Sequence, residues 1–324
     1  MRFCIPMLAV LGVLAVAGCG ERQSLANDAG PDARPPDAPP PDAPAPLANY
    51  SAVWGSATDD VWAVGSGVTA HWNGTAWTEG TASEGPYAIS LFAVWGTAHD
   101  DVWAAGSSIG GRLGHFDGRT WTVMEAPPGV GYVFSLWGSA PDDVWATAVI
   151  NGAEMLHWDG QAWTEVPGTF IDGNLNAVRG LAASDVWAVG NTRTGGLAMH
   201  YDGASWTSMA VDVPLQLAAV WGSASDDVWA VGEGGEIVHW DGKTWTVTAS
   251  GTTVDLDGVW GSGPDDVWAV GWEGTILRWD GKAWHPMSSG TTAILSGVWG
   301  SAAEDVWVVG SGPNLSPGVR MHVP

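Results

Sequence analysis

The side chains best suited to chemistry in this chain are histidines and paired carboxylates, and both recur at regular intervals. Imidazole and carboxylate groups ligate metal ions and transfer protons. One histidine per repeat, spread around a ring, would lie too far from the next to share a tetrahedral metal site. We therefore expect no metal site and interpret the histidines as a repeated strand position: His71, His115, His157, His200 and His239.

Acidic residues precede Val-Trp in every repeat, usually as a pair such as Asp226-Asp227. Adjacent carboxylates seldom converge on one ion, and the spacing of an EF-hand is absent. Asp side chains also accept hydrogen bonds from nearby backbone N–H groups and so stabilise turns. We predict that role for these acids and for the Asp of each Asp-Gly step: Asp59/Asp60, Asp100/Asp101, Asp142/Asp143, Asp185, Asp226/Asp227, Asp265/Asp266, Glu304/Asp305, and Asp117, Asp159, Asp202, Asp241 and Asp280.

Four landmarks recur from Tyr50 onward: V-W-G, D-V-W, an aromatic residue before Asp-Gly, and W-T. Successive D-V-W tryptophans, from Trp62 to Trp307, lie 41, 42, 42, 42, 39 and 39 residues apart. Each landmark sits in a short run rich in Val, Ala, Trp, Thr or Ile, bounded by turn residues. Four short strands per repeat, seven times over, predict an all-β, seven-bladed β-propeller spanning residues 47–324, with a β-solenoid as the alternative.

Two stretches of the repeat resemble known propeller families. WDGKTW at 240–245 resembles the shortened Asp-box of BNR-type propellers, and DVWAVG followed by GGEIVHWDGKTWT is similar to blades of the photosystem II assembly factor family. The resemblance implies that V-W-G forms the innermost strand, D-V-W the second, H-W-D-G the end of the third and W-T the outermost. Only SGPNLSPGVRMHVP follows the last DVWVVG, so the last blade is expected to be incomplete, without a W-T strand.

The chain holds 24 tryptophans, and all but Trp272 belong to the four landmarks. Burying one indole removes about 150–250 Å² from water, a gross gain of roughly 4–6 kcal/mol as an upper bound. We therefore predict that the landmark tryptophans form the core between blades; a sugar-binding array is the alternative.

The net charge is strongly negative, at −24, with only 11 Lys and Arg residues. Such a surface repels phosphate backbones and anionic lipid surfaces, so nucleic acid is not an expected partner. We expect a monomer.

The N-terminus has the features of an export signal. An apolar run of 14 residues, 3–16, is too short to span a bilayer well and precedes VAGC. VAGC resembles the lipobox of bacterial lipoproteins, which implies removal of residues 1–18 and acylation of Cys19; an ordinary cleaved signal or an uncleaved anchor are the alternatives. Gly20 is not the Asp that the family links to inner-membrane retention, so the outer membrane or cell surface is favoured.

Residues 19–46 carry Cys19 and a tether rich in Pro, Asp and Ala, including PDARPPDAPPPDAPAP. Proline fixes φ and removes a backbone donor, so neither a helix nor a central strand is expected. A solvated polyproline-II-like spacer could reach roughly 80 Å. A PxxP ligand is the alternative interpretation.

Asp-box propellers include sialidases, so the resemblance also raises a glycosidase. Such a site needs an arginine cluster, a Tyr nucleophile and an acid pair, and no spacing assembles the candidates Arg112, Arg179, Arg193 and Arg320 with a tyrosine. No nucleophile elbow, phosphate loop or metalloprotease motif is present. We therefore predict a protein without catalytic residues or cofactor, with a sialidase-like glycosidase as the alternative.

The repeat leaves two kinds of loop free to vary, those joining the second strand to the third and those joining successive blades. In a propeller both lie on one face, where rigid scaffolds carry binding residues. Aromatic and Arg side chains anchor interfaces. We predict a binding face for an extracellular or periplasmic protein or glycan, with an assembly factor for other envelope proteins as an alternative, at Tyr87, Arg112, Tyr132, Arg193 and Trp272.

Overall fold

The landmarks of the sequence form antiparallel strands that pair in chain order. The computed structural model describes residues 48–84, 87–107, 113–150, 152–312 and 318–323. Val, Trp and Thr favour extended backbone, and the Gly, Asp and Ser between them favour turns. V-W-G lies in the first strand of each repeat, D-V-W in the second, the run before Asp-Gly in the third and W-T in the fourth, which confirms the predicted strand order. A pair between Tyr132 and Ser107 also joins the second and third repeats into one eight-stranded sheet.

The strand bounds follow this order. First strands are β1 (Tyr50–Ala57), β7 (Ser90–Ala98), β11 (Tyr132–Ala140), β15 (Gly173–Ala182), β19 (Leu217–Ala224), β23 (Leu256–Gly263) and β27 (Ile294–Ala302). Second strands are β2 (Asp60–Gly65), β8 (Asp101–Ser107), β12 (Asp143–Val149), β16 (Asp185–Thr192), β20 (Asp227–Gly232), β24 (Asp266–Gly271) and β28 (Asp305–Ser311). Third strands are β3 (Val68–Trp72), β9 (Leu113–Phe116), β13 (Ala153–Trp158), β17 (Gly195–Tyr201), β21 (Ile237–Trp240), β25 (Ile276–Trp279) and β29 (Val319–Val323). Fourth strands are β4 (Trp77–Thr81), β10 (Trp121–Met124), β14 (Trp163–Glu165), β18 (Trp206–Ala210), β22 (Trp245–Val247) and β26 (Trp284–Met287); β5 (Ser83–Glu84) and β6 (Tyr87–Ala88) form a small hairpin, and η1 (Glu233–Gly235) and η2 (Trp272–Gly274) are single helical turns.

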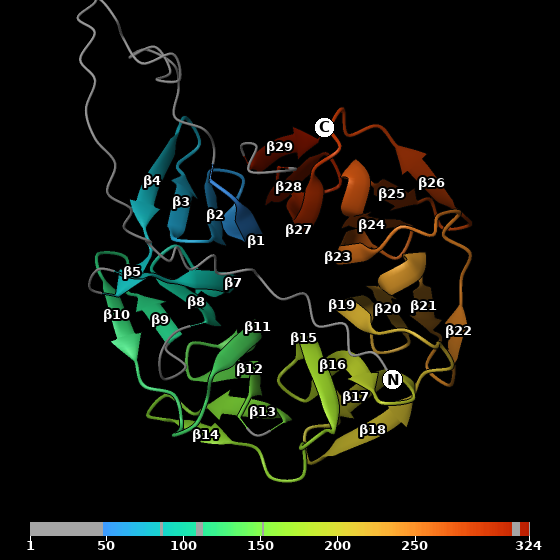
Figure 1. Ribbon diagram of the computed structural model, residues 1–324, viewed down its shortest axis with the longest axis horizontal. Coiled ribbons are helices and arrows are strands. Elements are labelled where there is room, and N and C mark those ends of the chain that lie inside the picture. Colours follow the sequence, from blue (N-terminus) through green and yellow to red (C-terminus); the bar gives the residue numbers. More distant parts are fainter. Residues whose placement is uncertain (1–47, 85–86, 108–112, 151, 313–317, 324) are drawn as a thin grey trace, which may run out of the picture. The chain divides into compact units, whose positions relative to one another are not determined.

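The first strands stand around a common axis (Figure 1). Each packs against the next one along the chain, and β27 packs against β1, so the set closes on itself. A solenoid would leave its first and last strands apart, so the β-solenoid alternative is wrong. Within the described residues, no helix is long and apolar enough to cross a membrane.

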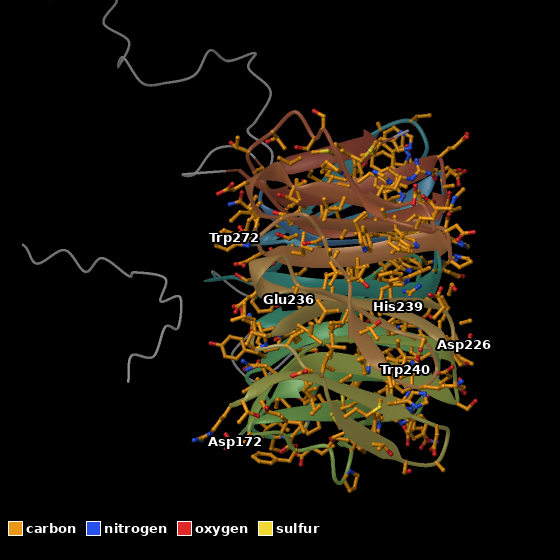
Figure 2. All side chains as sticks on the ribbon, turned by 90° about the vertical axis from the view of Figure 1, so that its right-hand side faces the viewer. Asp172, Asp226, Glu236, His239, Trp240 and Trp272 are labelled. Carbon is orange, nitrogen blue, oxygen red and sulfur yellow. The ribbon has the colours of Figure 1, made fainter. Side chains whose placement is uncertain are left out.

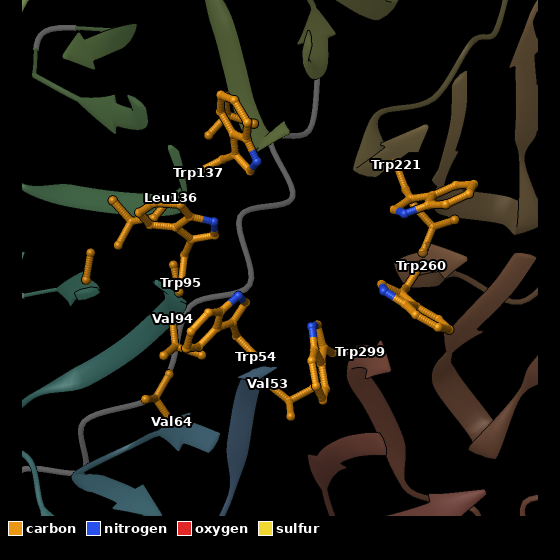
Figure 3. Packing of buried hydrophobic residues seen from close by; sticks show 14 of the residues in the cluster. Val53, Trp54, Val64, Val94, Trp95, Leu136, Trp137, Trp221, Trp260 and Trp299 are labelled. Atoms are coloured by element: carbon orange, nitrogen blue, oxygen red, sulfur yellow. The ribbon is translucent and has the colours of Figure 1, made fainter. Parts of the chain in front are cut away.

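Each V-W-G tryptophan packs across a sheet boundary onto the glycine of the next repeat. The Trp54 ring lies so close to Gly96 that a Cβ there would overlap it, and Trp299 meets Gly55 in the same way. Figure 3 shows these tryptophans around the axis. We call the set the tryptophan ring; Arg179 takes the equivalent position in the fourth repeat, and the members are Trp54, Trp95, Trp137, Trp221, Trp260 and Trp299.

The D-V-W tryptophans fill the space between neighbouring sheets. Trp62 stacks on His71 of its own sheet at 4.3 Å between ring centroids and meets Trp121 of the next sheet edge-on at 5.6 Å. Trp307 of the last repeat meets Trp77 of the first repeat in the same way, at 5.5 Å. These tryptophans are buried, so the prediction that they form the core between sheets is confirmed.

A hydrogen-bonded group of Asp, His and Ser or Thr recurs beside the first turn of the sheets. In the first repeat Asp60 accepts a hydrogen bond from His71 Nε2 at 2.6 Å and another from the Ser56 hydroxyl. Ser56 is the extra residue of a β-bulge in β1, and the bulge turns its hydroxyl toward the carboxylate. The equivalent contacts measure 2.6 to 2.8 Å at Asp101–His115, Asp143–His157, Asp185–His200, Asp227–His239, Asp266–Arg278 and Asp305–His322.

The turn role predicted for the acidic pairs is therefore wrong for the second acid of each pair. That carboxylate accepts hydrogen bonds from side chains of the third strand and of the first turn, instead of from the backbone N–H groups of the turn. The prediction is confirmed for the Asp-Gly steps, where Asp241 Oδ1 accepts the backbone N–H groups of Lys243 at 2.9 Å and Thr244 at 2.8 Å. The histidines do occupy a repeated strand position, as predicted.

We expect acid to destabilise the fold through these carboxylates. Burial raises the pKa of Asp227, but hydrogen bonds from His239 and Ser223 outweigh burial and hold that pKa below its ordinary value; Asp60 and Asp101 behave alike. A folded-state pKa below the unfolded value means that the stabilisation is present above about pH 4 and is lost as the pH falls through the folded-state pKa. Urea unfolding midpoints measured from pH 7 to about pH 2.5 should fall mainly below pH 4.

The variant Asp227→Asn tests whether these carboxylates cause the acid sensitivity of the fold. It should lose roughly 1–3 kcal/mol at pH 7 and show a shallower acid slope, because it lacks one of the titrating carboxylates. Asp226→Asn, at the exposed neighbour in the same turn, is the matched control and should keep the wild-type slope. Equal slopes in all three proteins would show that other groups cause the acid sensitivity.

The ends of the described chain meet through the last sheet. That sheet has three strands, and its third strand β29 places His322 opposite Trp307, as β3 places His71 opposite Trp62. Among the described residues no W-T strand joins this sheet, as predicted, but VRMHV was not recognised as a third strand because Val323 stands where other repeats have an aromatic residue.

An ion pair joins β29 to the first sheet. Arg320 Nη2 lies 3.2 Å from Glu79 Oε1 on β4, and the Tyr50 hydroxyl donates to the same carboxylate oxygen at 3.0 Å. The guanidinium also lies over the Tyr50 and Trp77 rings, 5.0 and 4.6 Å from their centroids. Burial raises the pKa of Tyr50, so its hydroxyl stays a donor. Arg320, a candidate for a sialidase-type cluster, instead links the last sheet to the first sheet.

Candidate functional site

A second β-bulge interrupts every first strand, three residues before the V-W-G position. In β1 the pairing moves from Tyr50–Gly65 to Ala52–Val64, which leaves Ser51 without a partner. Regular alternation would turn this residue away from the side that carries Trp54, but a bulge re-aims the side chain. The equivalent residues form what we call the bulge ring: Ser51, Phe92, Phe134, Asn176, Ala218, Asp257 and Ser296.

The bulge ring and most of the tryptophan ring line one hollow on the axis. Its volume is about 550 Å³, and all seven bulge-ring residues face it. Three residues of strand separate the rings, or about 10 Å. The tryptophan ring repeats one residue type, whereas the bulge ring mixes aromatic, acidic, amide, hydroxyl and small side chains. Such a mixture is what a specific binding site requires.

One side of the bulge ring is aromatic. Phe92 and Phe134 stack at 5.8 Å between centroids with 20° between their planes. Tyr132 continues the stack on Phe134 at 6.1 Å and 6°, and is 48% exposed. Exposed, pre-stacked rings present a flat apolar surface with little conformational entropy to lose on binding.

The sixth repeat adds an acid to the ring. Asp257 accepts a hydrogen bond from Trp272 Nε1 at 3.1 Å. Burial raises the pKa of Asp257 to about 6; the Trp272 hydrogen bond opposes this shift, and the charges of Asp255 and Glu233 add to it. Trp272 itself is 46% exposed on the helical turn η2, so its indole covers the acid while offering a face to a ligand.

The variable loops lie where the strand order predicted. Figure 2 shows Trp272, Glu236 and Asp172 at one edge of the sheets and Asp226 at the opposite edge. The first edge carries the loops between second and third strands and the N-terminal ends of the first strands, where the bulge ring lies; we call it the bulge face. The edge with Asp226 is the turn face.

The structure brings two of the five predicted binding residues to the bulge ring, Tyr132 and Trp272. Arg193 is exposed and forms an ion pair with Asp172 at 2.8 Å, and nothing in the described residues connects it to the hollow. Arg112 lies outside the described residues, and Tyr87 belongs to strand β6, with its side chain also outside them.

Sequence reasoning missed Asp257, Asn176 and Phe134 as members of one ring. A signal was present in the sequence. The position three residues before each V-W-G tryptophan holds five different residue types, whereas the residue directly before the tryptophan is nearly always Val. The bulge that turns this variable position toward the axis, however, follows from strand register and not from composition.

Among the described residues, the candidates for catalysis do not converge. Arg320 pairs with Glu79 and Arg193 with Asp172, in different repeats. The Asp–His–Ser groups do not form a nucleophilic triad, because the hydroxyl donates to Asp and not to His. In the described ranges, no group of three or more His, Cys, Asp or Glu residues lies close enough to hold a metal ion.

Comparison with known proteins places the architecture among β-propellers. No family model matches the chain, and no curated protein matches it in sequence. The solved structure of YCF48 bound to D1 peptide superposes with a TM-score of 0.69 at 15% identity, over 86% of this chain and 93% of the other. Virginiamycin B lyase from Staphylococcus aureus has a TM-score of 0.69 at 14% identity, covering 80% and 91%, and the WD40 propeller of Doa1 has 0.65 at 14%, covering 85% and 92%. Described residues of this chain therefore form an all-β propeller.

Proposed function

We propose that this chain is a seven-bladed, lipid-anchored interaction propeller of the bacterial cell envelope that binds another protein at the bulge face. The observation that carries the proposal is the bulge ring: seven equivalent positions, aimed at one hollow, that carry five different residue types. The other repeated side chains have structural roles. The D-V-W tryptophans pack against the W-T tryptophans of the next repeat, and the histidines form hydrogen bonds with the aspartates.

A protein ligand fits this site better than a glycan. Stacked Phe92, Phe134 and Tyr132 provide the rigid aromatic anchors typical of protein interfaces. Two of the polar side chains that could bind a sugar are already engaged, because Asn176 donates to the Leu217 carbonyl at 2.7 Å and the Ser135 hydroxyl to the Val178 carbonyl at 3.4 Å. The propeller of YCF48 was solved with a bound peptide, which supports a polypeptide ligand for this chain. The resemblance to Asp-box propellers supports only the propeller fold.

Photo-crosslinking in intact cells tests the binding face. A benzophenone amino acid at position 132 should form an adduct with a discrete envelope protein, while the same group at Val247, 60% exposed on the outer strand β22, should not. Phe134→Ala with Trp272→Ala should lower the yield by at least about tenfold, because anchors of this kind contribute 2 kcal/mol or more. Val123→Ala with Val247→Ala is the matched control.

Two outcomes would contradict the proposed partner class. An adduct that resists protease but is removed by glycosidases would identify a glycan. Equal yields from positions 132 and 247, unaffected by Phe134→Ala with Trp272→Ala, would show that the bulge face is not the binding face.

The anchoring part of the proposal depends on Cys19, which lies outside the described residues. We expect the mature chain to begin at Cys19 and to carry acyl chains, because VAGC follows an apolar run of 14 residues. Intact-mass analysis of the membrane fraction should show the loss of residues 1–18 and the added lipid. A Cys19→Ser protein that is still cleaved and equally membrane-bound would refute the lipid anchor.

A further inference from the structure

Among the residues that the structure describes, Arg179 is the only charged side chain at the level of the tryptophan ring. It occupies the V-W-G position of the fourth repeat and lines the same hollow as Trp221, Trp260 and Trp54. Within the described residues, no ion pair or side-chain hydrogen bond of Arg179 is formed, whereas Arg193, Arg278 and Arg320 each pair with a carboxylate. A guanidinium without a counter-charge in such a place is costly.

Arg179 is half-buried at the wall of the hollow. The guanidinium keeps some contact with the hollow, yet protein atoms enclose it closely enough that burial lowers its pKa. Asp257, the other charged group lining the hollow, has Asp255 and Glu233 as its charged neighbours and does not neutralise Arg179. The cation is therefore left without a counter-charge at a hollow whose lining combines indole and valine side chains with serine, amide and carboxyl groups.

We propose that Arg179 is the anchor of a carboxylate-binding site at the floor of the hollow, reached from the bulge face. A guanidinium matches a carboxylate with two parallel hydrogen bonds, and hydrogen bonds between two charged groups are stronger than neutral ones. A single positive charge in so acidic a protein suits a monoanion better than a phosphate. About 10 Å of channel separates the bulge ring from Arg179, so the carboxylate belongs to a small organic acid or to the carboxyl end of an extended polypeptide.

This inference deepens the proposed function, since a polypeptide end would be the end of the partner protein. The bulge-ring aromatics would contact the residues that precede the terminus. Asp257 would disfavour further acidic residues at that depth, because it already has two acidic neighbours.

Calorimetric titration of the full mature chain tests the site with three probes: acetyl-trialanine with a free carboxylate, its C-terminal amide, and acetate at matched ionic strength. The free acid should bind at least about tenfold more tightly than the amide, because only the acid carries the charge that Arg179 would pair. A free acid at least tenfold tighter than acetate would identify a chain end as the source; equal affinities would identify a small acid.

The variants Arg179→Trp and Arg179→Gln should abolish the preference for the acid. Arg179→Trp restores the residue found in the other repeats, and Arg179→Gln is a second variant in case the indole does not fit beside Leu181. Arg193→Ala, which removes an exposed arginine on the bulge face, is the matched control and should keep the preference. Wild-type protein that binds neither acid, binds acid and amide equally, or keeps its acid preference in both Arg179 variants would overturn the inference.

The cross-linking experiment separates this inference from the proposed function. A position-132 adduct that forms in a protein without acid preference would leave the protein-binding proposal intact and refute the Arg179 site. Acid binding without any adduct would support the Arg179 site and refute the protein-binding proposal.

Discussion

Deleting residues 312–324 should lower the melting temperature by at least about 10 °C, since roughly 2–4 °C is lost per kcal/mol in a domain of this size and several kcal/mol are removed. The deletion removes β29, which pairs with β28 over five residues from Val319 to Val323 and brings Arg320 to Glu79. It also uncovers β28 and Trp307 at a sheet boundary, and an exposed strand edge promotes association between copies. Differential scanning calorimetry of the full mature chain measures the shift.

The point variant Arg320→Met separates the ion pair from the strand. It keeps the aliphatic stem over Trp77 but leaves Glu79 without its cation, and Glu79 is partly exposed, so we expect a smaller loss of about 1–3 kcal/mol. Val123→Ala, on the exposed outer strand β10, should have almost no effect. A deletion protein that melts within about 2 °C of wild type would show that closure does not depend on β29.

The strand order could be predicted because each landmark has one structural role in every repeat. Trp62 packs between two sheets only if a histidine and a W-T tryptophan stand at the positions of His71 and Trp121. The same contact is made in most of the other repeats, so the spacing of these residues is constrained along the whole chain. The third strand of the last sheet could not be predicted in this way. Met321-His322-Val323 lacks the aromatic residue and the Asp-Gly step, and only pairing with β28 shows that His322 is the repeat histidine.

The candidate binding site was predicted only in part, for a related reason. Tyr132 and Trp272 stand out as aromatic residues in variable loops, and composition alone selects them. Asp257 and Asn176 lie inside strands, where alternation would place them on the side away from the axis. A bulge reverses that placement, and bulges depend on which backbone groups pair across the sheet.

The V-W-G glycine should be nearly as sensitive to substitution as the core tryptophans. A Cβ at Gly180 would overlap three atoms of the Trp137 indole, which comes from the preceding repeat. The ring cannot retreat without disturbing its own sheet, so Gly180→Ala should cost about 2–3 kcal/mol, at the upper end for overpacking. Urea unfolding of the full mature chain, with the slope checked for two-state behaviour, measures this cost.

Gly222 provides the matched control because Arg179, not Trp, precedes it around the ring. A Cβ at Gly222 would lie 3.0 Å from the Asp227 carbonyl oxygen and from Val228 Cγ2, and 3.4 Å from Leu181, distances that small shifts relieve. Gly222→Ala should therefore cost less than about 1 kcal/mol. In the double variant Trp137→Ala with Gly180→Ala, the glycine substitution should cost little beyond Trp137→Ala alone, because the overlapping ring is gone. If the two losses simply add, the glycine is required by its own strand and not by the neighbouring tryptophan, and the coupling that we infer between adjacent repeats does not exist.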